Sequence, residues 1–143
     1  TRGNLLQDNI HNNFLIFSNI NELNDMFGDK IETKMEIVEK CKYFLEKGVK
    51  NVILSRGGEG ALLINENFVL EASVPKGSLI NSIGAGDSMV AGFIAGHVKG
   101  LSVEDSFKLS VASGSATAYS YGLAEEKLVN KLYNEINIIK ENY

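Results

Sequence analysis

The chain has 143 residues, of which 44% are hydrophobic and 22% are charged, and its formal net charge is −4. This composition predicts a single globular domain with a buried core. The absence of a basic run argues against nucleic acid or an anionic membrane as the main partner. No apolar run approaches the length of a membrane span and no signal peptide is recognisable, so we expect a cytoplasmic protein.

Cys41 is the only cysteine, so it cannot form an internal disulfide. It falls within a helical pattern, which predicts a buried thiol in a reducing compartment. The chain begins at Thr1 rather than at a methionine. Residues 1–13 are polar and begin in the middle of a sequence pattern rather than at its start. We therefore expect a piece of a longer protein, in which Leu5, Leu6 and Ile10 end an amphipathic helix.

Apolar periodicity predicts the elements of the first half of the chain. They are a strand at 14–17, a helix at 20–27 ended by Gly28, a helix at 34–47 stopped by Gly48, and a buried strand at 52–54. The longer helix is the clearest of these, because apolar residues recur at near-helical spacing from Met35 to Leu45 with Glu and Lys between them.

The second half is predicted to begin with two strands, at 61–64 and 68–70, joined by a hairpin-like turn at 65–67. A loop marked by Pro75 and Gly77 follows, and then come helices at about 86–98, 103–121 and 124–139. Strands that alternate with helices predict an α/β layered sheet with parallel strands and helical crossovers. Ligands of such sheets lie beyond the carboxyl ends of the strands.

The most informative segment is Ser82–Ala91, in which a loop with Gly84, Ala85 and Gly86 runs into Asp87 and then into a helix of small and apolar residues. The amides at a helix N-terminus favour an anion. A carboxylate beside a phosphate suits a general base that takes a proton from an attacking hydroxyl. The alternative is that Asp87 only caps its helix.

A second glycine cluster follows the strand at 52–54. It consists of Ser55, Arg56, Gly57, Gly58, Glu59 and Gly60. Such a loop can cradle phosphates with its amides, although it is neither a Walker A loop nor a dinucleotide fingerprint. The alternatives are a tight turn between two strands and, for Arg56, a solvated loop arginine.

Asn19 and Glu22 follow the first strand and are three residues apart, so they face the same side of a starting helix. Glu22 could orient a water on Mg²⁺ while Asn19 touches a phosphate. The alternative, which local sequence favours, is a helix cap formed by the two side chains. The small-residue helix at 110–118 either packs tightly or lines an adenine slot, and His11 and His97 lack the spacing of metal ligands.

Four stretches in this order resemble motifs of the ribokinase-like (PfkB) carbohydrate kinases. They are Asn19–Glu22, Ser55–Gly60, Gly84–Phe93 and Ala112–Ala118. The sequence around Gly84–Met89 and Gly114–Ala118 is most similar to that of the sugar-phosphate branch of the family, the 1-phosphofructokinases and tagatose-6-phosphate kinases. The resemblance implies a three-layer α/β fold with helices on both faces of the sheet, of which residues 1–143 are the C-terminal, ATP-binding half.

The resemblance also implies a role for each motif. Asp87 would be the catalytic base, and Gly84, Ala85 and Gly86 would supply the anion-hole amides. Ser55–Gly60 would hold ATP phosphates, Asn19 would reach the nucleotide, Glu22 would belong to the Mg²⁺ environment and Ser115 would lie near the adenine. A monovalent cation is implied near residues 81–83 and 117–124, and a homodimer is implied for the full-length protein.

Two departures from the family pattern stand out. Phe17 and Ser18 occupy the positions where relatives have Lys-Pro, which predicts weaker ligand contacts or only a reshaped turn. Thr1-Arg2-Gly3 resembles the end of a segment that lies mid-protein in the family, so the sugar-binding half and the lid sheet would precede it.

The expected reaction is ATP-dependent phosphorylation of a sugar phosphate, with fructose 1-phosphate as the first candidate. The isolated piece is expected to be inactive. The alternatives are a non-catalytic nucleotide-binding fragment, a half-enzyme that needs its N-terminal part, and a purely structural α/β domain.

Overall fold

A computed structural model describes residues 14–28, 30–75, 77, 79–80, 83–120 and 125–142. The chain divides into two compact units. The first consists of Thr1–Glu71 with Lys140–Tyr143, and the second of Ala72–Ile139. The predicted helix end at Leu5–Ile10 and the segment Thr1-Arg2-Gly3 lie outside the described residues.

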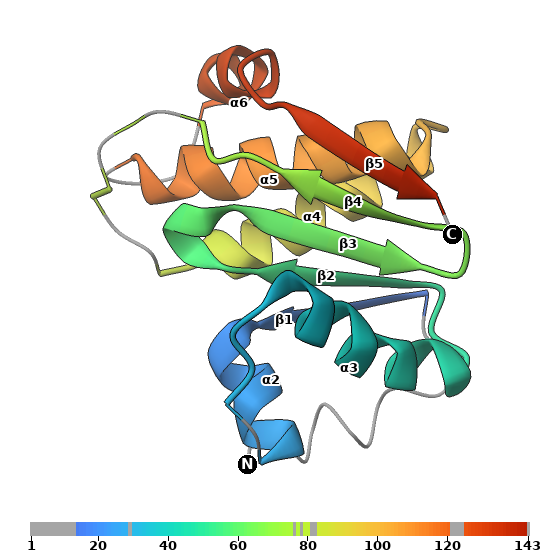
Figure 1. The fold of residues 1–143 in the computed structure, drawn as a ribbon. Helices are drawn as coiled ribbons and strands as arrows, with labels where there is room; N and C mark the ends of the chain where they lie inside the picture. Colours follow the sequence, from blue (N-terminus) through green and yellow to red (C-terminus); the bar gives the residue numbers. More distant parts are fainter. Residues whose placement is uncertain are drawn as a thin grey trace. The chain divides into compact units, whose positions relative to one another are not determined.

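The strands form one five-stranded sheet in the order β1-β2-β3-β4-β5 (Figure 1). Their bounds are β1 Leu15–Asn19, β2 Asn51–Ser55, β3 Ala61–Asn65, β4 Phe68–Ala72 and β5 Ile138–Asn142. β1 and β2 pair in parallel, as expected, whereas β2 and β3 pair antiparallel, so the predicted parallel strands do not extend to this pair. Only residues 56–60 join β2 to β3, and a parallel crossover needs a dozen residues or more.

Helices α2 (Ile20–Phe27) and α3 (Lys34–Glu46) supply the core of the first unit. α2 has the predicted bounds and ends on Gly28 in the left-handed region, whereas α3 ends one residue before the predicted limit. Side chains of both helices share one core with the strands. The fully buried members of this core include Leu23, Cys41, Phe44, Val52 and Leu62. Every residue of β3, and all of β2 but its last, is buried, as in a sheet covered on both faces.

The predicted turn between β3 and β4 is confirmed, and one side chain organises it. The Oδ1 atom of Asn65 accepts hydrogen bonds from the amides of Asn67 and Phe68, each at 2.9 Å. An Asn that bonds the backbone two and three residues ahead mimics a backbone turn. The short reversal therefore follows directly from the residue that ends β3.

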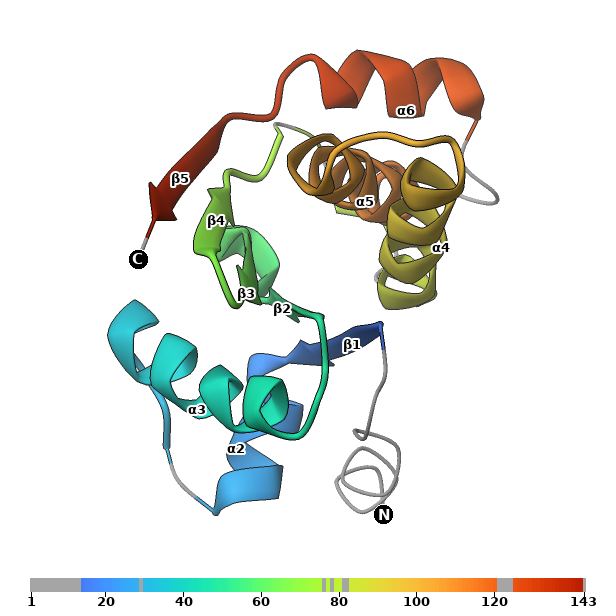
Figure 2. The same ribbon diagram turned by 90° about the vertical axis from the view of Figure 1, so that its right-hand side faces the viewer.

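In the second unit, helices α4 (Ala85–Val98) and α5 (Val103–Ala118) pack closely against each other (Figure 2). A Cβ atom placed on Gly96 would lie 2.9 Å from the Cα of Ser106, and one on Gly92 would lie 3.1 Å from the Cα of Ser110. Only glycine permits this backbone approach. Tight packing is thus confirmed for the small-residue helix.

The end of the chain differs from the prediction of one helix over 124–139. Helix α6 covers only Glu126–Tyr133, and β5 follows it. The apolar positions Leu132, Ile136 and Ile139 keep helical spacing, which explains the error. Beyond Asn134 the chain leaves the helix and extends, and the amide of Ser73 donates to the carbonyl of Asn137 at 3.1 Å. Pairing with a strand overrides a weak helical preference here.

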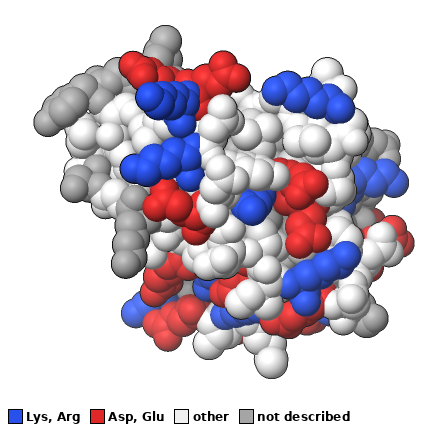
Figure 3. Space-filling model, turned by 90° about the horizontal axis from the view of Figure 1, so that it is seen from above, with Lys and Arg blue, Asp and Glu red and all other residues white. Residues whose placement is uncertain are grey.

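Charge is evenly distributed on the face of the molecule shown in Figure 3, where Lys and Arg side chains alternate with Asp and Glu. This mixture matches the modest net charge of −4. Among the described residues, none of the helices combines the length and the apolar character that a membrane span requires.

Candidate active site

The start of α4 is the segment that the sequence predicts as an anion site. Gly84 precedes the helix with φ +84°, in the left-handed region, and no side chain caps the helix at this position. The first amides of an α-helix have no acceptor within the helix. The carbonyl of Gly84 already accepts from the amide of Ser88 at 3.0 Å. The first amides of α4 therefore have no acceptor within the helix and no side-chain cap.

Asp87 lies in the first turn of this helix and is exposed. Its carboxylate therefore does not point into the core. The neighbouring Ser88 is anchored, because its Oγ lies 2.7 Å from the Oγ1 of Thr117 near the end of α5. This hydrogen bond ties the turn that carries Asp87 to a second helix. The sequence analysis placed Thr117 within the motif Ala112–Ala118 but did not foresee this contact.

Ser115 lies in the last turn of α5 and is half-buried. The neighbouring Gly114 faces α4 closely, since a Cβ there would lie 3.2 Å from the carbonyl oxygen of Ala85. The segment with Ser115 is thereby held beside the N-terminal turn of α4. The second unit thus brings together Gly84–Asp87 and Ser115.

The cluster Ser55–Gly60 forms a compact turn with a short 3₁₀ helix, η1, at Gly57–Glu59. The amide of Arg56 donates to the carbonyl of Gly60 at 2.8 Å, and the amide of Glu59 donates to the carbonyl of Arg56 at 3.2 Å. A tight turn between two strands is therefore present, as the plainer interpretation held. Its exposed residues are Gly57, Gly58 and Glu59, so their backbone remains accessible to a ligand.

The side chain of Arg56 is not a solvated loop arginine, because only 13% of it is exposed. Its Nη2 lies 2.9 Å from Oε2 of Glu71 on β4. The other oxygen of Glu71 lies 3.1 Å from Nζ of Lys34, and this Nζ also lies 2.6 Å from Oε1 of Glu141. The sequence analysis weighed a phosphate contact against a solvated side chain for Arg56 and did not foresee this pairing, because Glu71 is 15 residues away in the sequence.

Asn19 and Glu22 form the helix cap that local sequence favours. The Oδ1 of Asn19 accepts from the amide of Glu22 at 2.8 Å, and its Nδ2 donates to Oε1 of Glu22 at 2.8 Å. Asn19 pairs in parallel register with Ser55. Because the carboxyl ends of parallel strands meet at one edge, the cap and the glycine-rich loop lie at the same edge of the sheet.

Phe17 and Ser18 are part of strand β1, directly before this cap. β1 keeps its parallel register with β2 through both residues and on to Asn19. Ser18 is fully buried, and its Oγ donates to the carbonyl of Asn19 at 3.0 Å. Whether Phe17 and Ser18 weaken ligand contacts or only reshape the turn stays a prediction.

The described histidine and the cysteine do not belong to a metal-ligating cluster. Among them, no group of three or more His, Cys, Asp or Glu side chains is arranged to hold a metal ion. His97 is exposed in the last turn of α4, and His11 lies outside the described part of the chain. Cys41 is buried, and burial raises the pKa of its thiol to about 12, which confirms a structural thiol.

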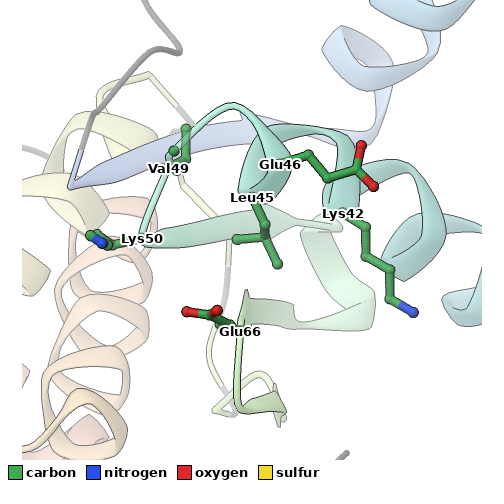
Figure 4. A pocket seen from close by; sticks show the side chains of 7 residues that line it. Lys42, Leu45, Glu46, Val49, Lys50 and Glu66 are labelled. Atoms are coloured by element: carbon green, nitrogen blue, oxygen red, sulfur yellow. The ribbon is translucent and has the colours of Figure 1, made fainter.

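A surface cavity of about 670 Å³ lies away from all the predicted site residues. Figure 4 shows its lining, with Lys42 and Glu46 from α3, Lys50 before β2 and Glu66 from the β3–β4 turn. Positive and negative side chains are balanced there. This cavity therefore gives no sign of the anion chemistry that the glycine-rich segments predict.

Comparison with known proteins decides the family. A family model described as pfkB family carbohydrate kinase matches residues 4–129. The chain belongs to this family. A 1-phosphofructokinase of Bacillus subtilis (strain 168) is 47% identical over 127 residues, which are 89% of this chain and 42% of that protein. The pfkB chain thus spans less than half the length of this relative.

Solved structures agree with the family and with the expected ribokinase-like α/β fold. Ribokinase of Arabidopsis thaliana, solved with ribose and ATP, has a TM-score of 0.74 and 26% identity, covering 83% of this chain and 40% of that one. Phosphofructokinase-2 of Escherichia coli, solved in complex with potassium, has a TM-score of 0.80 and 25% identity. That match covers 87% of this chain and 41% of that one.

Proposed function

We propose that the full-length protein, the polypeptide as its gene encodes it, transfers the γ-phosphoryl group of ATP to a hydroxyl of a sugar phosphate. Family membership supports a carbohydrate kinase, and the similarity to a 1-phosphofructokinase makes fructose 1-phosphate the first substrate to test. The structural observation that supports the proposal is the start of α4, where exposed Asp87 lies in a first turn that no side chain caps.

In this proposal Asp87 takes the proton from the attacking hydroxyl as the new bond to phosphorus forms. The amides of Gly84, Ala85 and Gly86 stabilise the charge on the moving phosphoryl group. Ser115, held beside this turn by the α4–α5 contact, lies on the nucleotide side. The residues that are assigned these roles all lie in the second unit.

The first unit is proposed to bind ATP phosphates through the exposed backbone of the loop Ser55–Gly60. The guanidinium of Arg56 is already neutralised by Glu71, so backbone amides rather than this side chain would meet the anion. Asn19 and Glu22 stand at the same edge of the sheet. Glu22 could orient a water on Mg²⁺, an ion that keeps several waters and binds few carboxylates directly.

A monovalent cation is a further part of the proposal, supported by the potassium complex of the Escherichia coli enzyme. Its expected position, residues 81–83 and 117–124, falls largely outside the described residues. We also propose a homodimer for the full-length protein and the cytoplasm as its location, which suits a buried free thiol at Cys41.

The decisive experiment replaces Asp87 by Asn in the full-length protein. Loss of a general base is expected to lower kcat with fructose 1-phosphate by about 10²–10⁴-fold, while the Kd for ATP stays nearly unchanged. Asp105→Asn is the matched control, because Asp105 is likewise the third residue of its helix, α5. Its kcat should equal that of the wild type. Equal turnover in the Asp87 variant would refute the base assignment.

A second experiment separates this proposal from the alternative of a nucleotide-binding piece without activity of its own. The full-length protein and the 143-residue chain are assayed with fructose 1-phosphate, tagatose 6-phosphate and fructose 6-phosphate, and their melting temperatures are measured with and without MgATP. Turnover by the full-length protein but not by the 143-residue chain supports a kinase whose N-terminal part is needed. A thermal shift without turnover in either sample supports the alternative.

A further inference from the structure

The ion pairs beneath the glycine-rich loop form a chain of alternating charges. Arg56 pairs with Glu71, Glu71 pairs with Lys34, and Lys34 pairs with Glu141. These four side chains come from the loop, β4, the first residue of α3 and β5. We refer to them as the loop clamp. Two positive and two negative charges make it neutral overall.

Glu71 occupies the centre of the loop clamp, because each of its two oxygens serves a different cation. Oε2 accepts from Nη2 of Arg56 at 2.9 Å, and Oε1 accepts from Nζ of Lys34 at 3.1 Å. Both cations lower the pKa of Glu71, with the Arg56 hydrogen bond as the largest cause. The carboxylate therefore stays ionised and bridges the start of α3 to the loop.

Arg56 is also the residue at the base of the loop. Its amide donates to the carbonyl of Gly60, and its carbonyl accepts from the amide of Glu59. The same residue thus closes the turn with its backbone and reaches β4 with its side chain. The turn that carries Gly57 and Gly58 and the ion pair with β4 therefore share this one residue.

The environment of Arg56 makes the pair with Glu71 hard to replace. Only 13% of the side chain is exposed, and the buried Nε has no hydrogen-bond partner among the described residues. A buried charge that loses its partner carries a large desolvation penalty. Removal of the Glu71 carboxylate therefore forces Arg56 either to remain unpaired or to leave its site.

We propose that Glu71 is a positioning residue for nucleotide binding, which holds the Gly57–Gly60 backbone in its binding conformation through Arg56. This inference rests on the proposed function, because it assigns the loop to ATP phosphates. It goes further in naming a β4 carboxylate, remote from the glycine motif in sequence, as a determinant of ATP affinity. Lys34 supports Glu71 from the opposite side.

The test uses Glu71→Gln in the full-length protein, with two readouts. Hydrogen–deuterium exchange of the loop amides at 57–60 is expected to become faster. The KM for ATP is expected to rise about tenfold, the size of one lost charge-assisted hydrogen bond. The KM for the sugar phosphate and the kcat at saturating ATP should stay within about twofold of the wild type, because the loop does not carry the chemistry.

Two further variants complete the design. Glu71→Asp keeps a negative charge between Arg56 and Lys34 and should recover part of the ATP affinity that Glu71→Gln loses. Glu32→Gln is the control, because both side chains of the ion pair between Glu32 and Lys30 are largely exposed. This control should match the wild type in both readouts.

Lys34→Gln keeps the test decisive if Glu71→Gln fails to fold. It removes one support of Glu71, so a smaller rise in loop exchange and in the KM for ATP is expected. Unchanged loop exchange, an unchanged KM for ATP or tighter ATP binding in the foldable variants would overturn the proposal. An inactive wild-type protein would count against the proposed function instead, and loop exchange would then still report on the clamp.

Discussion

The N-termini of α2 and α4 differ in whether a side chain accepts a hydrogen bond from their unpaired amides. At α2, the Asn19 side chain accepts from the Glu22 amide and donates to the Glu22 carboxylate, so the helix end is closed by its own residues. At α4, Gly84 has no side chain to offer and the helix start has no side-chain cap. A capped start gains local stability, whereas an uncapped start keeps its donors for a ligand.

The uncapped helix is held in place by packing instead. α4 approaches α5 closely at Gly92 and Gly96, and the Ser88–Thr117 hydrogen bond anchors its first turn. The helices α3 and α5 begin with side-chain caps from Thr33 and Ser102, as α2 does with Asn19. The difference teaches that a candidate binding helix can give up its cap when its neighbour fixes its position.

The largest expected effect comes from breaking the α4–α5 contact. In Gly96→Ala the new methyl group would lie 2.9 Å from the Cα of Ser106, so the helices must separate. We expect the free energy of unfolding of the full-length protein to fall by about 2 kcal/mol, as for other overpacked cores. Urea denaturation measures this loss.

The control for that variant lies on the same helix. Val98 is exposed, so Val98→Ala removes no core contact and should change the free energy of unfolding by less than about 0.5 kcal/mol. If Gly96→Ala were as stable as Val98→Ala, packing would not be what holds α4.

A second comparison, between alanine variants of Gly84 and Gly28, separates backbone strain at the start of α4 from a role in the reaction. Gly84 and Gly28 both have left-handed φ angles, of +84° and +68°, and neither would meet a close neighbour on gaining a Cβ. Alanine at either position should therefore cost about 1 kcal/mol of stability through backbone strain alone. Both losses can be read from denaturation curves.

The two glycines should differ in activity. Gly84→Ala shifts the amides that we assign to the phosphoryl group and should lower kcat by about tenfold or more, because oxyanion donors act only at fixed positions. Gly28 ends α2 and has no assigned role in the reaction, so Gly28→Ala should leave kcat unchanged. Equal kcat values for the two variants would remove the distinction between the two helix starts.

The capped start provides a third, smaller test. Asn19→Ala removes the side chain that closes α2 and should lower the free energy of unfolding by about 1 kcal/mol. Thr33→Ala removes the corresponding cap of α3 and should cost a similar amount. A rise in the KM for ATP in Asn19→Ala but not in Thr33→Ala would show that Asn19 also contacts the nucleotide; no such rise would leave it a cap alone.

Local signals in the sequence predicted most elements well. The bounds of α2, the glycine before α4 and the Asn65 turn each depend on residues within a few positions of one another. The errors arose where distant strands decide. Ile136 and Ile139 keep helical spacing, yet the chain extends after Asn134 to join the sheet next to β4.

In the candidate site, too, features that depend on neighbouring residues were predictable and features that depend on distant residues were not. The glycine motifs and Asp87 are contiguous, so they could be found from the sequence. The partners that support them could not, because Glu71 is 15 residues from Arg56 and Thr117 is 29 residues from Ser88. Glu71 did leave one signal, a carboxylate within the apolar strand Phe68–Ala72. A charge in such a strand indicates a partner but does not identify it.

The smallest expected effect concerns the pH dependence of the loop clamp. The hydrogen bond from Arg56 is the main cause that lowers the pKa of Glu71 below its ordinary value of 4.5. A carboxyl group with a lowered folded-state pKa stabilises the fold fully above its unfolded pKa and loses this contribution as the pH falls through the folded value. Because Glu71 is partly exposed, we expect only about 0.5 kcal/mol from it.

Denaturation of the wild type and of Glu71→Gln at pH 7, 4.5 and 3 isolates this contribution. The difference in the free energy of unfolding between the two proteins should be largest at pH 7 and should shrink below pH 4.5, because the protonated wild-type carboxyl then resembles the amide. Any packing difference between Glu and Gln is independent of pH and cancels. A difference that stays constant from pH 7 to pH 3 would mean that the Glu71 charge does not stabilise the loop, which would leave the two helix starts, rather than the clamp, as the features that organise the site.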